Sequence, residues 1–429
     1  MKSSLLQISI VLSGMLVTIA LPAGTPAHAQ GATARYAVTD LGTLGGANSF
    51  AYSMNRSGMV TGGANTPGQN DLFAQTAFLW YGGPLINLGT LGDGACPDCS
   101  SQGAAAAPDG SVVMISETAN ADPDGQDFCE FGTHRQCLPA ISRLGLLTPL
   151  RTLPGGNNAE AFFTNSRGEA VGASEIGALD ATCATPFQVH LFEAVKWTAA
   201  GEPTPLRPLS GDTVSFAFTN NDNGQVAGFS GLCSNVTLPP FLPPSAPHAV
   251  IWDASGTPHD LGSPTGGAGD NVATAINNQA QITVNSVMLD GTVHASVWNG
   301  TGLQDLGTYP SDAFVTAVPC CNNINDRGQI AGFSIDSQFN QRAILWANTN
   351  TAPVDLNAWV PADSPWYLIS PGGISAAGEI AVTAVNLQTF EIHAVVLSPV
   401  NGVGRAARGA IKPPVLPESV RRLLRSQVR

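Results

Sequence analysis

The stretch Asn221-Asp222-Asn223-Gly224, followed by Gln225-Val226-Ala227-Gly228, contains the repeat that decides the fold of this chain. An Asn side chain can accept hydrogen bonds from backbone amides a few residues later, and Gly tolerates the positive φ that closes a hairpin. The short, mostly apolar segment after the Gly is typical of a β-strand. The block therefore predicts a tight turn that leads directly into a strand.

The same block recurs along most of the chain. Clear copies stand at 55–58, 165–168, 221–224 and 325–328, and degenerate copies stand at 107–110, 277–280 and 375–378. The last positions of successive copies are 52, 58, 56, 56, 48 and 50 residues apart. A repeat of this length indicates that one supersecondary unit is used seven times.

Each unit has room for four short strands. A small residue precedes the turn by four positions in every copy, as inner strands that crowd around an axis require: Ala51, Gly103, Ala161, Ala217, Ala273, Cys321 and Pro371. Third strands are expected at 76–80, 248–252, 294–298, 342–346 and 393–397, with an irregular copy at 139–143. Fourth strands carry Asp-Leu-Gly at 40–42, 260–262 and 305–307. The pattern, with 47 Gly, 31 Pro and only 11% charged residues, predicts an all-β, seven-bladed β-propeller of four-stranded blades over 36–400.

The two ends of the array predict how the ring closes. The series begins with a fourth-type strand at 36–41 and stops on a third-type strand at 393–398. If the N-terminal strand completes the last blade, two exposed sheet edges disappear. An open solenoid would need capping repeats instead. We therefore expect a closed ring.

The flanking segments predict an exported protein. Residues 1–29 have a basic start, an apolar stretch and Ala27-His28-Ala29, the pattern of a cleaved signal peptide; the competing interpretation is a membrane anchor. No later stretch is long enough for a transmembrane anchor. The expected location is secreted or periplasmic.

Charge is divided unevenly between the body and the C-terminal end. Residues 31–400 contain 10 basic and 30 acidic residues, whereas the tail at 401–429 has seven basic residues against Glu418. An acidic body argues against nucleic acid as a partner, because phosphate contacts need a basic surface. The basic tail is expected to be solvated, with contact to an anionic membrane as the alternative. We expect a monomer.

The repeat resembles the HAF family of extracellular repeat proteins, named for His-Ala-Phe at the start of the third strand. That motif stands here as His-Ala-Val at 248 and 393, His-Ala-Ser at 294 and Thr-Ala-Phe at 76; the stretch 40–46 and the segment from 355 to 368 are also similar. The resemblance covers 36–400 and departs most in the second unit. It implies export and a propeller-like fold, and it implies no activity.

Loop lengths indicate where a ligand would bind. Counted from the fourth residue after the turn Gly to the Ala of the third strand, units one to four have 15, 26, 22 and 21 residues, and units five to seven have 11, 11 and 12. In a propeller these loops share one face with the connections that enter each blade; we call it the long-loop face, and the opposite side the turn face. Enlarged loops on a rigid scaffold often carry binding, although drift in tolerant loops explains them equally well.

All eight cysteines fall in connections of the long-loop face. An even number in an exported chain predicts disulfides. We expect Cys129 to pair with Cys137 and Cys183 with Cys233, with Cys96–Cys99 as a further pair; a redox or zinc half-site is the alternative for this last pair. Cys320 and Cys321 are expected to form a vicinal disulfide or to remain as two buried thiols.

Two sets of polar residues are candidate metal ligands. Asn120, Asp122 and Asp124 have oxygens at alternate positions before Gly125, as in a calcium loop, but the Glu expected at the twelfth position is missing. Calcium is the one cofactor that the sequence suggests. His248, His294 and His393 share a register in separate blades, so we interpret them as strand-packing residues.

These features favour a secreted binding propeller for a glycan, peptide or protein. The alternative is an extracellular hydrolase or lyase that acts at the channel mouth. No nucleophile elbow, zinc-protease motif or phosphate-binding loop is present in the sequence. Two or more convergent carboxylates at the channel mouth would favour the enzyme, and exposed aromatics without them would favour binding.

Overall fold

The computed structural model describes residues 35–400 except 70–71, 93, 144, 184–187, 238–244, 267–268, 311, 313, 318–321 and 339. The predicted signal peptide at 1–29, the basic tail at 401–429 and Cys320–Cys321 lie outside the described residues. None of the helices in the described ranges has the length and hydropathy of a membrane span.

The described chain is built almost entirely of short strands, which we group in chain order as blades one to seven. Blade one is β2 (Ser49–Met54), β3 (Val60–Ala64), β4 (Thr76–Trp80) and β5 (Ile86–Gly89). Blade two is β6 (Ser101–Ala106), β7 (Val112–Ala121), β8 (Arg135–Arg143) and β9 (Leu146–Pro149). Blade three is β10 (Ala159–Thr164), β11 (Ala170–Leu179), β12 (His190–Trp197) and β13 (Pro203–Leu206).

The second half continues the pattern. Blade four is β14 (Val214–Asn220), β15 (Val226–Gly231), β16 (His248–Trp252) and β17 (Pro258–Asp260), with the 3-10 helix η1 (Cys233–Asn235) in its loop. Blade five is β18 (Asn271–Ile276), β19 (Ile282–Val287), β20 (Val293–Trp298) and β21 (Leu303–Asp305). Blade six is β22 (Phe314–Ala317), β23 (Ile330–Ile335), β24 (Gln341–Trp346) and β25 (Val354–Asp355), followed by η2 (Leu356–Trp359). Blade seven is β26 (Trp366–Ile374), β27 (Ile380–Asn386), β28 (Ile392–Pro399) and β1 (Tyr36–Asp40).

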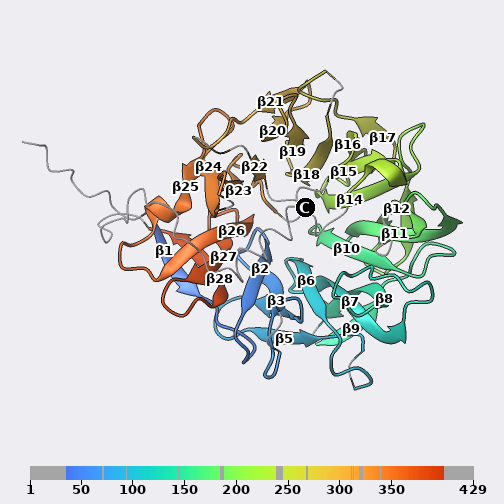
Figure 1. The fold of residues 1–429 in the computed structure, drawn as a ribbon, viewed down its shortest axis with the longest axis horizontal. Helices are drawn as coiled ribbons and strands as arrows, with labels where there is room; N and C mark the ends of the chain where they lie inside the picture. Colours follow the sequence, from blue (N-terminus) through green and yellow to red (C-terminus); the bar gives the residue numbers. More distant parts are fainter. Residues whose placement is uncertain are drawn as a thin grey trace, which may run out of the picture.

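Neighbouring strands within each blade are antiparallel, and the blades stand in a ring around a central axis (Figure 1). Five blades are separate four-stranded sheets, while blades five and six share one eight-stranded sheet through a single parallel pair, Val293 with Phe314. Division at this pair gives seven groups of four strands in the described chain, the number that the repeat spacing predicts. The predicted β-propeller fold is confirmed.

The ring is closed by the N-terminal strand, as the sequence predicts. β1 pairs antiparallel with β28, from Tyr36 opposite Pro399 to Asp40 opposite Val395. Figure 1 shows the two strands side by side at the outer edge of blade seven. The first and last parts of the described chain therefore complete one sheet, which removes the free edges that an open array would expose.

The Asn-x-x-Gly turns form the inner rim of the turn face. Asn221 Oδ1 accepts hydrogen bonds from the amides of Asn223 and Gln225 at 3.0 and 3.1 Å. Its Nδ2 donates to the carbonyl oxygen of Asn277 in the next blade at 3.1 Å. The Nδ2 groups of Asn165, Asn277 and Asn325 contact the following blade in the same way. Each turn therefore closes its own hairpin and also joins two blades.

The core lies between the faces of adjacent blades. Trp252 is fully buried in a cluster with Ala217 of its own blade and Val171 and Ala194 of blade three. Gly228 shows how tightly β15 meets the inner strand, because a Cβ atom there would lie 1.9 Å from the Phe216 carbonyl oxygen. Such close packing leaves no room for larger side chains, which explains why small residues recur in the inner strands of the repeat.

Candidate functional site

The long loops of blades two and three begin as extensions of their strands. β7 and β11 are each ten residues long, and their regular pairing ends at Glu117 and Glu175, respectively. Both glutamates are fully buried. A buried carboxyl group needs hydrogen bonds, so their partners determine how the loops are held.

Each of these glutamates fixes the connection that enters its own blade. Glu117 Oε2 accepts from the Ser100 amide at 2.7 Å, and its other oxygen accepts from the Thr133 hydroxyl. Glu175 Oε2 accepts from the amides of Asn157 and Asn158 at 3.2 and 2.9 Å. Burial raises the pKa of both carboxyl groups, and the hydrogen bonds oppose that rise.

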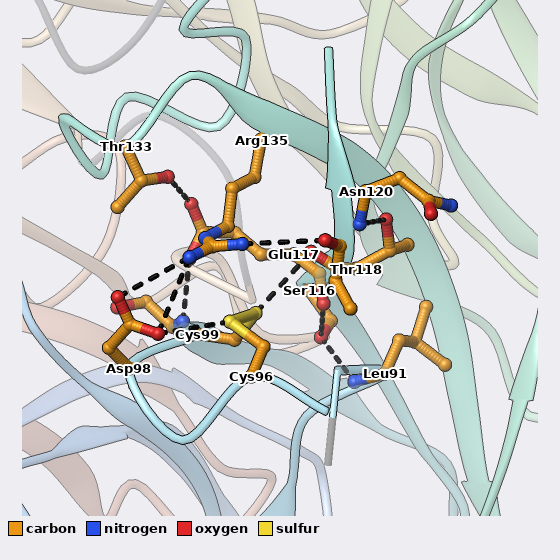
Figure 2. The surroundings of a disulfide bond; sticks show 12 residues. Leu91, Cys96, Asp98, Cys99, Ser116, Glu117, Thr118, Asn120, Thr133 and Arg135 are labelled. Atoms are coloured by element: carbon orange, nitrogen blue, oxygen red, sulfur yellow. Dashed lines mark hydrogen bonds and ion pairs between the residues drawn. A yellow bond between two sulfur atoms is a disulfide. The ribbon is translucent and has the colours of Figure 1, made fainter. Parts of the chain in front are cut away.

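The three predicted disulfides are present on this face. They join Cys96 to Cys99, Cys129 to Cys137 and Cys183 to Cys233. Figure 2 shows the first of them beside Asp98, whose carboxylate lies 3.4 Å from the Arg135 guanidinium of β8. Cys96 and Cys99 are bonded to each other, so neither sulfur is free to bind zinc, and a redox role for the pair stays an alternative. The cystine from Cys183 to Cys233 joins the loops of blades three and four.

A second set of contacts joins the loops of blades two and three. Asp124 Oδ2 accepts from Asn157 Nδ2 at 2.7 Å and lies 2.9 Å from His190 Nε2. His190 Nδ1 faces the Ile176 carbonyl oxygen at 3.1 Å, so both ring nitrogens face acceptors and the imidazolium is favoured. Partial burial lowers the pKa of His190, but the hydrogen bond that it donates to Asp124 and the negative charge of Glu175 outweigh this effect, and the pKa is raised.

The calcium candidates lie within this network. Asp122 Oδ1 accepts from the amides of Asp124 and Gln126, and its Oδ2 accepts from Asn158 Nδ2 at 2.7 Å. Asn120 lies apart from these contacts, with its Nδ2 3.4 Å from Gln136 Oε1. Across the residues that the structure describes, no group of three or more His, Cys, Asp or Glu is arranged to hold a metal ion. The hydrogen bonds give both aspartates a role without a cation, and a calcium role for Asn120, Asp122 and Asp124 stays a prediction.

Two further carboxyl groups on this face have no partner. Glu130 lies in the loop between β7 and β8, and Glu160 is the second residue of β10, the innermost strand of blade three. Neither carboxyl group has a hydrogen bond or ion pair with any residue in the described ranges, although both residues make backbone hydrogen bonds. Their sequence neighbours Phe128, Cys129 and Phe162 belong to one apolar cluster, which brings the two segments together.

The surroundings raise the pKa of both of these carboxyl groups, although both residues are only partly buried. Burial raises the pKa of Glu160 to about 8. Burial, the nearby Glu160 and then Asp127 raise the pKa of Glu130 to about 10. Strongly shifted carboxyl groups without a structural partner are typical of functional sites. The pair is the strongest candidate site on the long-loop face.

Carboxylates also meet on the turn face, but there one guanidinium lies between two of them. Arg56 of blade one reaches Asp222 of blade four at 3.4 Å and Asp326 of blade six at 2.8 Å. Asn278 Nδ2 donates to Asp222 at 2.8 Å, and the Asp326 carboxylate accepts from the Asn278 amide. The two Arg56 contacts join blades that are not neighbours in the ring, and the Asn278 contacts join neighbouring blades, which indicates a structural role.

The sequence-predicted histidines are paired within their blades. His248 lies 3.2 Å from Asp260, and His294 lies 2.9 Å from Asp305; in both pairs the Asp opens the Asp-Leu-Gly motif. The third histidine, His393, pairs with Asp40 in the same way. The three histidines do not converge, as expected from their register.

Sequence reasoning missed the Glu130–Glu160 pair, although one signal was present. Glu160 directly precedes the small residue of its inner strand, and it is the one charged residue at that register; the other copies have Phe50, Gln102, Phe216, Val272, Cys320 and Ser370. No such signal marks Glu130, because its loop has no counterpart of equal length in the other blades.

Comparison with known proteins supports the fold and names no family. No protein-family model matches the chain, and no curated protein matches it, so membership of the HAF family stays a prediction. A puromycin hydrolase structure matches with a TM-score of 0.50 and 12% identity, over 89% of this chain and 58% of that chain.

Two other solved structures are similar at lower scores. The β-propeller domain of the Trilobed protease from Pyrococcus furiosus has a TM-score of 0.47 and 8% identity, over 85% of this chain and 99% of that domain. YCF48 bound to D1 peptide has a TM-score of 0.45 and 10% identity, over 88% of this chain and all of that one (100%). At such low identity these likenesses concern the fold alone.

Proposed function

We propose that this chain is an exported binding propeller that takes a glycan, peptide or protein ligand on its long-loop face, over blades two to four. The supporting observation is the continuous connection among these loops, from Asp124 and His190 to the Cys183–Cys233 disulfide. Loops that are already ordered lose less conformational entropy when a ligand binds. Disulfides of this kind persist outside the reducing cytosol, which supports a secreted or periplasmic location.

Within that face, we place the ligand against Glu130, Glu160 and the adjoining apolar cluster of Phe128 and Phe162. The two carboxyl groups have no side-chain partner in the described chain and are only partly buried, so a ligand can reach them and form hydrogen bonds with them. The aromatic side chains offer an apolar surface beside these polar groups, a combination typical of ligand sites.

Glycan and peptide arrays test this placement. We expect a reproducible hit for the mature protein that weakens by about twofold to tenfold in Glu160→Gln and Glu130→Gln, because each lost neutral hydrogen bond contributes about 0.5 to 1.5 kcal/mol. Glu202→Gln is the matched control, since Glu202 is exposed on the turn face and pairs with Arg151. A hit that survives both site variants, or that Glu202→Gln abolishes, would contradict the placement.

A second candidate is an extracellular hydrolase or lyase, and the Glu130–Glu160 pair is the observation that favours it. Acid–base chemistry needs one protonated and one ionised group. With a pKa of about 8 for Glu160 and about 10 for Glu130, that combination is most populated between these two values. Turnover of a bound polysaccharide or peptide would then follow a bell-shaped pH profile in the alkaline range.

The enzyme is tested on whichever ligand class the arrays identify. Product release should be followed between ~pH 6 and pH 11, with wild type, Glu130→Gln and Glu160→Gln compared. If the chain is such an enzyme, both variants should still bind the ligand, and their turnover should fall by about 10²-fold or more. Turnover that either variant retains, or a profile with its maximum below the pKa of Glu160, would exclude this pair as the acid and base.

A further inference from the structure

A second buried polar cluster lies at the joint between blades six and seven. Its centre is Arg342, the second residue of β24, whose side chain is 9% exposed. Three carboxylates surround the guanidinium: Asp312 at 3.4 Å from Nε, Asp336 at 3.7 Å from one terminal nitrogen and Asp355 at 3.9 Å from the other. The side chains of Asp312 and Asp355 are 2% and 6% exposed.

The cluster has more negative than positive charge. One guanidinium faces three carboxylates, and the ring of Tyr309 lies 4.8 Å below the guanidinium and adds no charge. A buried charge that no opposite charge balances is costly, and the cost falls when a carboxylate takes up a proton. The remaining titratable group near the cluster is Tyr367 of β26.

Two polar groups in the cluster are left without a hydrogen bond. Arg342 Nε has none, and neither does the hydroxyl group of Tyr367, although that residue is 1% exposed. An unsatisfied buried hydroxyl costs roughly 1 to 3 kcal/mol. A protonated aspartic acid is both a donor and an acceptor, so it could satisfy a neighbour that a carboxylate leaves unpaired.

The cluster also connects directly to the contacts that hold the two blades together. Asp355 caps η2 by accepting from the Asn357 amide at 2.8 Å. The Asn357 side chain in turn accepts from the Leu368 amide of β26 at 2.8 Å and donates to its carbonyl oxygen at 3.0 Å. Leu368 follows Tyr367 in β26. A change in charge at Asp355 therefore reaches this strand of blade seven through Asn357, at the residue next to Tyr367.

We propose that the Arg342 cluster is an acid-sensitive joint, which tightens the contact between blades six and seven when Asp312 and Asp355 take up protons. Burial raises the pKa of both groups above the ordinary value of 3.8, whereas hydrogen bonds from Asn340 and Gln338 hold the pKa of Asp336 below it despite partial burial. A carboxyl group with a raised folded-state pKa adds stability as the pH falls toward its unfolded value. The joint is therefore tightest in mild acid.

Hydrogen exchange at the joint tests the proposal on the full mature chain. After correction for the intrinsic pH dependence, exchange of the Leu368 amide should slow by about tenfold per unit of pKa shift between ~pH 8 and pH 5. Asp312→Asn and Asp355→Asn should each reduce this response. Asp253→Asn, on an exposed turn of blade four, is the control and should leave it unchanged.

Arg342→Gln gives a second, independent readout. Without the guanidinium, the three carboxylates lose their one opposite charge, so this variant should be strongly destabilised at ~pH 8 and should regain thermal stability at ~pH 5. An equal loss at both pH values, or an unchanged exchange response in both aspartate variants, would overturn the proposal. Tightening of the joint by Ca²⁺ or Na⁺ at constant pH would overturn it too, because the cluster would then take a cation instead of protons.

Discussion

Asp40 and His393 join the first described strand to the last: Asp40 Oδ1 lies 2.8 Å from His393 Nδ1 across the β1–β28 pair. The two residues are 353 positions apart in the chain. They repeat the His–Asp contacts inside blades four and five, where the two partners are only 12 and 11 positions apart. The same His–Asp contact therefore joins two strands within blades four and five and closes the ring in blade seven.

This pair predicts that ring closure weakens in acid. Partial burial would raise the pKa of Asp40, but hydrogen bonds from His393 and the Gly42 amide hold it below 3.8. A lowered folded-state pKa gives stability that is present above the unfolded value and is lost as the pH falls through the folded one. His393→Ala should cost about 0.5 to 1 kcal/mol at neutral pH, because the pair is partly exposed, and this difference should vanish at ~pH 2.

The contribution of the whole closing strand is larger. Removal of residues 31–42 deletes β1 and unpairs β28, so thermal unfolding should shift down by about 5 °C or more, as expected for a loss of several kcal/mol in a large domain. Calorimetry of the truncated and full-length mature proteins measures this shift. An unchanged transition would show that β1 does not close the ring in solution.

The Cys183–Cys233 disulfide is expected to stabilise the fold by about 2 to 4 kcal/mol, because it closes a 50-residue separation between two blades. The Cys183→Ser, Cys233→Ser double variant should lower the denaturant midpoint accordingly. Replacement of Cys96 and Cys99, three positions apart, is the matched control and should cost less. Non-reducing mass spectrometry that finds Cys183 and Cys233 alkylated would contradict the pairing.

Asn221→Ala should destabilise the ring by about 2 to 3 kcal/mol. It removes the acceptor for two turn amides and the donor to the Asn277 carbonyl oxygen, and Asn221 is buried. Asn223→Ala is the control, since that exposed residue makes one contact between blades and should cost less than about 1 kcal/mol. Equal losses in urea denaturation would mean that the contact between blades, which both variants lose, sets the effect, and that the turn acceptor of Asn221 adds nothing.

Glu160→Gln should stabilise the protein in alkali. The folded-state pKa of Glu160 is raised to about 8, so the wild type loses stability as the pH rises from 4.5 toward that value. The amide cannot ionise, so the variant should exceed wild type by more than about 1 kcal/mol above pH 8 and match it near pH 4. Chemical denaturation across this range measures the difference. If the stabilities of wild type and Glu160→Gln change in parallel with pH over this range, Glu160 is not desolvated.

The fold could be predicted from the sequence because the signals that specify it are local and repeated. An Asn that accepts from amides two and four residues later and a Gly with positive φ define each turn without reference to the rest of the chain. Seven copies of that turn, with small residues at a fixed distance before each, specify similar blades. The offset between the first and last strands then specifies the partner of β1.

The candidate site could be predicted only in part. The long-loop face and the pairing of Cys129 with Cys137 and of Cys183 with Cys233 follow from loop lengths and cysteine positions. The sequence by itself does not show that Glu130 and Glu160 come together, because the desolvation that shifts a pKa arises from residues packed around a carboxyl group, wherever they lie in the chain.

The same limit applies to Arg342, which occupies the register of His248, His294 and His393 in the repeat. Local sequence determined that a charged residue stands there beside the Asp of the fourth strand. Only the tertiary structure placed Asp312, Asp336 and Tyr367 around it, from connections and strands on either side of the blade. Periodic short-range interactions thus determine the scaffold, whereas irregular long-range packing decides which of its side chains are charged, buried and unpaired.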